Sequence, residues 1–139
     1  EMNFLQGDVT HAADGEYDLD AGSGVVVHGR GYATKGRPAR VGIRPSRLRI
    51  VESSVNGAVN TARAVVETKM YLGDEVQVVA ELTGGHRFLV REQRVGTDEV
   101  HDAISPGDRI TIQWELTAPV LLADAPAPND APNQGGTDE

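Results

Sequence analysis

Apolar and polar residues alternate with a period of two along most of the chain. The clearest run is Asp74–Leu82, where Val76, Val78 and Ala80 fall on one side and more polar residues fall on the other. Successive side chains of a β-strand point to opposite faces, so this run predicts a strand with one buried face.

Other extended runs are spread over the whole chain. They are Asn3–Val9, Tyr17–Asp20, Gly24–Gly31, Ala39–Pro45, Arg47–Glu52, Gly57–Leu72, Arg87–Val95 and Arg109–Leu116. Phe88 and Trp114 lie in apolar stretches of such runs and are expected in the core. Many short strands with almost no helical periodicity predict an all-β fold, a closed or nearly closed antiparallel barrel.

Two segments depart from this pattern. Thr97–Ser105 predicts one helical turn with Thr97 as its cap. Residues 123–139 are rich in Ala, Pro, Asn, Gly and acids, too polar to bury a core, and they predict a disordered tail. There is no strict internal repeat, but the strand order of the first part is loosely echoed in the second, each part ending in a turn and a strand.

Tight turns are marked by glycine and proline. Gly84 and Gly85 provide the positive φ angles of a hairpin turn, and Pro106 and Gly107 begin a turn before the last strong strand.

Charge is unevenly distributed along this chain of net charge −8. Residues 1–22 hold six acids and no Lys or Arg, whereas residues 23–51 hold seven bases and no acid. This asymmetry fits either an acidic strand region lying against a basic one or a face that binds anions or a partner. The sequence has no cysteine, which rules out disulfides and thiolate metal sites.

Catalytic motifs are missing from the sequence. The only lysines, Lys35 and Lys69, do not follow a phosphate-binding glycine loop, so the chain is not expected to bind ATP in that way. His101 lies among acids, and we interpret this stretch as a solvated turn, with a metal site as the alternative. No catalytic triad is indicated, and the fragment is not expected to be an enzyme. Few aromatics and the acidic net charge argue against single-stranded nucleic-acid binding.

Five segments, taken in order, resemble the C-terminal transport-associated OB, or TOBE, domain of ABC importer ATP-binding subunits, closest to the polyamine, iron and sugar type. They are Asn3–Val9, Val41–Ile50, the stretch from Val55 to Leu82 with Tyr-Leu-Gly, Ile104–Trp114 with Pro-Gly-Asp, and Ala118–Leu122. The resemblance implies an OB-like regulatory domain over residues 1–122, with first strands in 1–37 and a main barrel in 38–122. It also implies a fragment of a longer protein whose ATPase core precedes Glu1.

The resemblance further implies the domain's partners and location. The parent would bind ATP and Mg²⁺ through its core, pair with a second copy of the subunit, and contact membrane permeases from the cytoplasmic face of the membrane. No cofactor is expected in the fragment itself. In the stretch YLGDE, Gly73 and Asp74 would form the turn between two strands, with Leu72 and Val76 holding it in place.

One departure concerns the segment after Arg44-Pro45. The family usually has glutamate where this chain has Ser46, which puts a role needing a carboxylate there in doubt. As an alternative to the regulatory role, an anion or partner would contact Arg44, Ser46, Arg47 and Arg49. The competing interpretation is that Arg40, Arg44, Arg47 and Arg49 pair with the acids of residues 8–20.

Overall fold

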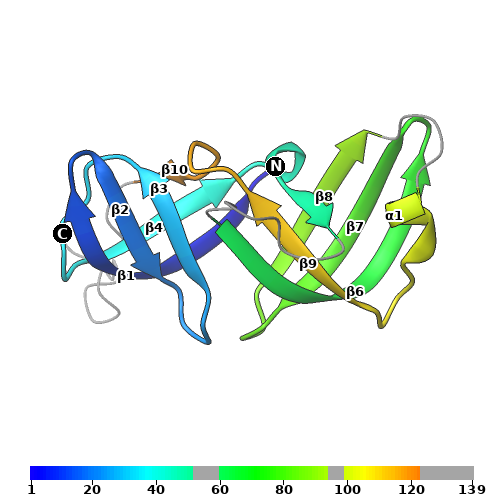
Figure 1. Ribbon diagram of the computed structural model, residues 1–139, viewed down its shortest axis with the longest axis horizontal. Helices are drawn as coiled ribbons and strands as arrows, with labels where there is room; N and C mark the ends of the chain where they lie inside the picture. The colour runs from blue at the N-terminus through cyan, green and yellow to red at the C-terminus, as the bar shows by residue number, and fades with distance from the viewer. Residues whose placement is uncertain (52–59, 94–98, 123–139) are drawn as a thin grey trace, which may run out of the picture.

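The structure is a computed structural model that describes residues 1–51, 60–93 and 99–122. These residues form two curled antiparallel sheets of five strands each, which lie side by side (Figure 1). The all-β, OB-like prediction is therefore confirmed. The predicted disordered tail, residues 123–139, lies outside the described residues.

Sheet A has the order β10 (Val120–Leu121), β4 (Pro38–Ile43), β1 (Asn3–Ala13), β2 (Glu16–Asp20) and β3 (Val26–Arg30). Sheet B has the order β5 (Arg49–Val51), β9 (Arg109–Trp114), β6 (Asn60–Leu72), β7 (Glu75–Leu82) and β8 (Arg87–Gln93). A 3-10 turn, η1 (Pro45–Arg47), precedes β5, and a short helix, α1 (Glu99–Ala103), lies between β8 and β9.

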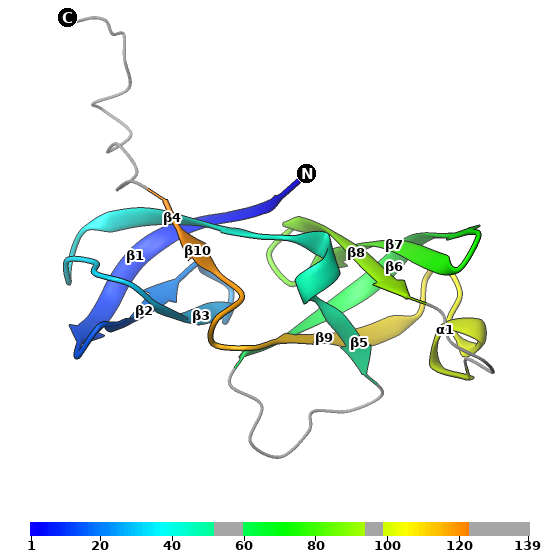
Figure 2. The same ribbon diagram turned by 90° about the horizontal axis from the view of Figure 1, so that it is seen from above.

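The chain crosses between the two sheets twice. After β4 it passes through η1 and gives β5 to sheet B, and after β9 it returns to give β10 to sheet A (Figure 2). Because β4 pairs with β1, the two sheets are divided between Ile43 and Arg49 and not between residues 37 and 38. A sheet is not a domain, so the division at residue 38 stays a prediction.

Both sheets are built on the same plan, which gives the loose echo in the sequence a structural basis. The pairing is irregular between Val9 and His11 in β1, and between Val66 and Thr68 in β6. At the first site Val9 exchanges backbone hydrogen bonds with Gly36 and Arg37, and at the second Val66 does so with Gly107 and Asp108. Such bulges bend a strand and increase its twist, which fits the curl of each sheet.

Two buried asparagines join the sheets to each other. Asn3, the first residue of β1, accepts the Leu89 N–H at 2.7 Å through Oδ1 and donates to the Leu89 carbonyl at 2.8 Å. Asn60, the first residue of β6, makes the same pair of bonds with His28 of β3, at 2.7 and 2.9 Å. We call these pairs the asparagine clamps, and each one satisfies an edge-strand peptide as another strand would.

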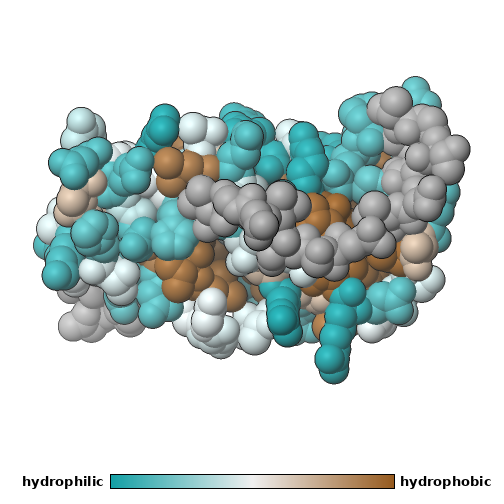
Figure 3. Space-filling model, in the orientation of Figure 1, coloured by the Kyte–Doolittle hydropathy of each residue, from teal (hydrophilic) through white to brown (hydrophobic). Residues whose placement is uncertain are grey.

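A continuous apolar core fills the inner faces of both sheets. Phe88 and Trp114 are 0% and 3% exposed, with ring centroids 6.1 Å apart, so their predicted core positions are confirmed. The predicted inward side of β7 is also confirmed, because Val76, Val78 and Ala80 are buried. On the face seen in Figure 3, hydrophobic residues gather near the middle of the molecule.

The YLGDE stretch forms the turn of the β6–β7 hairpin, with Gly73 at a φ of 63°. Val76 is buried, but the expectation that Leu72 also holds the turn is wrong, since Leu72 is 47% exposed. The end of β6 extends beyond the core, so the side chains there face solvent. Tyr71 instead holds this hairpin through its hydroxyl, which donates to Asp102 Oδ1 of α1 at 2.5 Å.

Candidate functional site

The predicted basic contact segment forms the connection from β4 to β5. Pro45 is buried and begins η1. Proline suits the first position of a helical turn, because the N–H that it lacks would have no partner within the turn. Around it, the side chains of Arg44, Ser46, Arg47 and Arg49 are all exposed. The structure therefore places the four predicted residues at one surface, but does not make them converge on a pocket.

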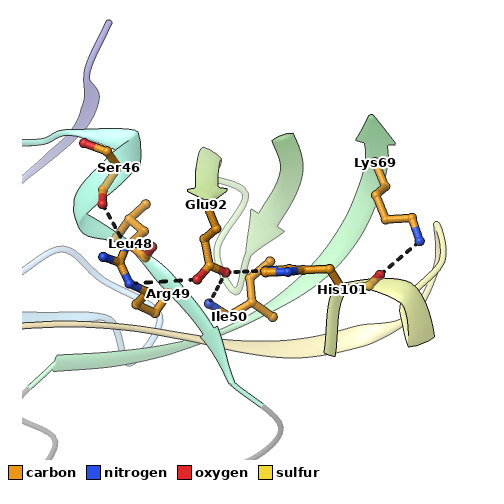
Figure 4. Close-up of polar contacts among 7 residues, drawn as sticks. All are labelled: Ser46, Leu48, Arg49, Ile50, Lys69, Glu92 and His101. Carbon is orange, nitrogen blue, oxygen red and sulfur yellow. Dashed lines mark hydrogen bonds and ion pairs between the residues drawn. The ribbon is translucent and has the colours of Figure 1, made fainter. Parts of the chain in front are cut away.

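Two of these arginines already have partners. Arg47 donates to the Thr117 hydroxyl at 3.0 Å and lies 3.5 Å from Glu115. Arg49 donates through Nη1 to the carbonyls of Ser46 and Leu48, both at 2.8 Å (Figure 4). Within the described residues, Arg44 makes no ion pair.

The interpretation that this group pairs with acids of residues 8–20 is wrong for Arg47 and Arg49, whose nearest acids lie on later segments. The guanidinium of Arg40 lies over the Phe4 ring, 5.4 Å from its centroid. Arg30, which is outside that group, does lie near such an acid, with its Nε 3.9 Å from Glu16. The reason is topological, because β5 leaves the acidic strands and joins sheet B.

Glu92 links β8 to β5 and α1. Its Oε2 accepts the Ile50 N–H at 3.0 Å and lies 2.6 Å from His101 Nε2, while its Oε1 is 3.9 Å from Arg49 (Figure 4). Lys69 Nζ donates to the carbonyls of His101 and Ile104 at the end of α1. Through its bonds to β5, the carboxylate of Glu92 joins the edge of sheet B at β5 to the opposite edge at β8.

His101 is not in a solvated turn, so that interpretation was wrong. Its side chain is 8% exposed and Glu92 is 11% exposed. Burial and the short contact with a carboxylate favour a structural ion pair or hydrogen bond here. Among the side chains that the structure describes, in residues 1–51, 60–93 and 101–122, no group of three or more His, Asp or Glu is placed to hold a metal ion.

An open hollow on the described surface lies elsewhere, where the two sheets meet. The turn between β2 and β3 reaches the turn between β7 and β8, so that a Cβ on Gly84 would lie 2.8 Å from the Ser23 side chain. Beside this contact is an open groove of about 870 Å³, lined by the β2–β3 turn and by β6, β7 and β9. Arg63 and Arg109 line it, and neither was singled out from the sequence.

Comparison with models of known protein families identifies the family of this chain. The family model described as "TOBE domain" matches residues 41–122, more than half of the chain. The chain belongs to the TOBE domain family. The match begins in β4 and ends after β10, two strands that pair with each other in sheet A.

A solved structure shares the TOBE fold of this chain. It is the cytoplasmic molybdate-binding protein ModG in a crystal form with molybdate bound, at 15% sequence identity and a TM-score of 0.76. The alignment covers 86% of this chain and 94% of that one. At this identity the likeness establishes the fold. The search of curated proteins found no match.

Chemically, this TOBE domain offers cations and hydroxyl groups on its surface. Arg47 and Arg49 are engaged with neighbouring hydroxyl, carbonyl and acidic groups, whereas the groove combines two arginines with several hydroxyl side chains. In the part of the chain that the structure describes, no helix is long and apolar enough to span a bilayer.

Proposed function

We propose that this chain is the C-terminal regulatory and assembly domain of an ABC importer ATP-binding subunit. The observation that carries the proposal is the family match over residues 41–122, which contains the Arg-Pro segment, the Tyr-Leu-Gly hairpin and the Pro-Gly-Asp turn in order. ATP and Mg²⁺ would bind to the preceding core, and this domain would take no part in the hydrolysis itself.

The role follows from what the domain offers to partners. In the complex it would pair with the domain of a second ATP-binding subunit, beneath the permeases at the cytoplasmic face of the membrane. Exposed apolar side chains at Phe4 and Val120 on the outside of sheet A, with Arg40 over Phe4, support a contact of this kind. Polyamine is the proposed transported solute, from the type of importer that the segments resemble.

The test is to purify the natural protein through an affinity tag placed at its C-terminus and to identify what accompanies it. We expect a subunit with an ATPase core, recovered as a dimer with permease subunits, and spermidine uptake that is lost when its gene is deleted. A natural protein without an ATPase core would refute the proposal. Normal spermidine uptake in the deletion strain would refute only the choice of solute.

A second candidate function is the binding of a small anionic solute by the TOBE domain itself. The fold shared with a molybdate-binding protein and the arginine-lined groove support it. Calorimetric titration with sulfate, molybdate and spermidine tests this candidate, and heat that saturates with an anion supports it. A gel shift at low salt would reveal the nucleic-acid binding that the acidic charge argues against.

A further inference from the structure

The groove between the sheets has a floor and a wall from different parts of the chain. The floor is formed by β6 and β9 of sheet B where they pair, and the wall is the β2–β3 turn at Ser23, Gly24 and Val25. Figure 1 shows this turn and the β7–β8 turn next to each other at the lower edge of the molecule. A hollow of about 870 Å³ is in the range of small-molecule sites, roughly 300–1,000 Å³.

Two arginines share the floor at neighbouring positions. Arg63 of β6 pairs with Thr111 of β9, and Arg109 pairs with Val65, so the two arginines are diagonal neighbours on one face. Cross-strand diagonal positions are about 7–8 Å apart, close enough for both guanidinium groups to reach one anion. Two planar forks of N–H donors match the oxygens of a carboxylate or phosphate group.

These arginines differ from most others in the structure. In the described residues, Arg63 and Arg109 have no ion pair. Arginines elsewhere lie beside carboxylates, namely Arg30, Arg47, Arg49, Arg87 and Arg91. Like charges held close together without a counter-charge repel each other, and a bound anion would relieve this repulsion.

The rest of the lining limits the type of ligand. The hydroxyls of Ser23, Thr61, Thr83 and Thr111 can donate or accept hydrogen bonds, and Val65, 42% exposed, adds an apolar contact. Glu81 is the one acid in the lining. Glu81 pairs across the sheet with Arg87, whose pKa is raised mainly by Glu67 and also by Glu81. Arg87 therefore partly balances the charge of Glu81 from outside the groove.

We propose that this groove binds a small hydroxylated organic anion, a phosphorylated or carboxylated metabolite, with its anionic group between Arg63 and Arg109. The groove is much larger than a bare inorganic oxyanion, and its hydroxyl groups suit the neutral part of a sugar-like molecule. This inference rests on the second candidate function and gives it a site and a ligand class. It does not depend on the identity of the parent protein.

The experiment is a titration of the chain followed by calorimetry and by backbone amide chemical shifts. Glucose 6-phosphate and gluconate represent the phosphorylated and carboxylated classes, and glucose and sulfate are the comparisons. We expect one of the two anionic sugars to bind more tightly than glucose or sulfate, with the largest shifts at Ser23, Arg63 and Thr111. Which of the two binds decides between a phosphate and a carboxylate.

Variants test the location. Arg63→Gln and Arg109→Gln should each weaken binding about tenfold or more, as expected for a lost charge-assisted hydrogen bond. Glu81→Gln should strengthen binding a fewfold, because it removes the one acid in the groove lining. Arg30→Gln is the matched control, an exposed arginine outside the groove that should leave affinity unchanged. Thermal unfolding of each variant shows whether it is folded.

The outcomes separate this inference from the candidate function. If Arg44→Gln or Arg47→Gln abolishes binding while Arg63→Gln and Arg109→Gln do not, the domain binds anions at η1 and the groove assignment is overturned. If neither anionic sugar binds but sulfate or molybdate does, anion binding remains and the ligand class is overturned. If no anion binds, the groove proposal and the second candidate function both fail. Weaker binding in Glu81→Gln would overturn the choice of a purely anionic ligand.

Discussion

Replacing Asn60 with alanine should destabilise the whole domain, because this side chain joins the two sheets. Asn60 is 0% exposed and makes one bond to the His28 N–H and one to the His28 carbonyl. In Asn60→Ala both peptide groups lose their partner at the junction. Each buried polar group left without a partner costs about 1–3 kcal/mol, so for two such groups we expect the free energy of unfolding to fall by roughly 2–6 kcal/mol. That is a large share of the ~5–15 kcal/mol typical of a domain.

Urea denaturation followed by Trp114 fluorescence measures this loss. Thr61→Ala, an exposed neighbour on the same strand, should change stability by less than about 0.5 kcal/mol. Asn60→Asp keeps an acceptor for the His28 N–H but places a carboxylate oxygen near the His28 carbonyl, so it should also be destabilising. An Asn60→Ala protein as stable as the Thr61→Ala control would show that the clamp contributes nothing.

Three further predictions concern stability. Burial raises the pKa of Tyr17 to about 12, so the contribution of its neutral side chain to the free energy of unfolding should be complete below about pH 10 and lost as the pH rises toward 12. Tyrosinate absorbance near pH 10 from a folded Tyr17, identified by comparison with Tyr17→Phe, would refute this. Gly29→Ala should cost about 1–3 kcal/mol, because its Cβ would lie 2.4 Å from the Tyr17 hydroxyl, and an unchanged urea midpoint would contradict it. Leu72→Asp should change the melting temperature little, since Leu72 is exposed; a large drop would mean that this side chain is buried.

Local patterns predicted the strands but not their partners. The alternation in β7 identified its buried side, because that property depends only on neighbouring residues. The sheet that β5 and β10 each join depends on pairing between segments far apart in sequence, which alternation does not specify. The exposure of Leu72 was missed for a similar reason, since the pattern does not show where a strand extends beyond the core.

The same difference between local pattern and long-range pairing explains which residues of the candidate site could be predicted from the sequence. The basic segment around Arg44 was visible because its charges are close together in sequence. Arg63 and Arg109 become neighbours only through the register of β6 and β9. Glu92 did leave a signal, because it follows Phe88 and Val90 on the inward side of β8, where an acid needs a partner.

The groove and the asparagine clamps should be coupled. The wall of the groove belongs to sheet A and its floor to sheet B, and Asn60 joins β6 of the floor to β3, which follows the wall turn. Asn60→Ala keeps both arginines but loosens the wall, so it should lower stability and also weaken binding of the anionic sugar severalfold. Arg63→Gln should weaken binding without lowering stability. Both measurements are made at a temperature where each variant is folded, and full affinity in Asn60→Ala would mean that the floor alone forms the site.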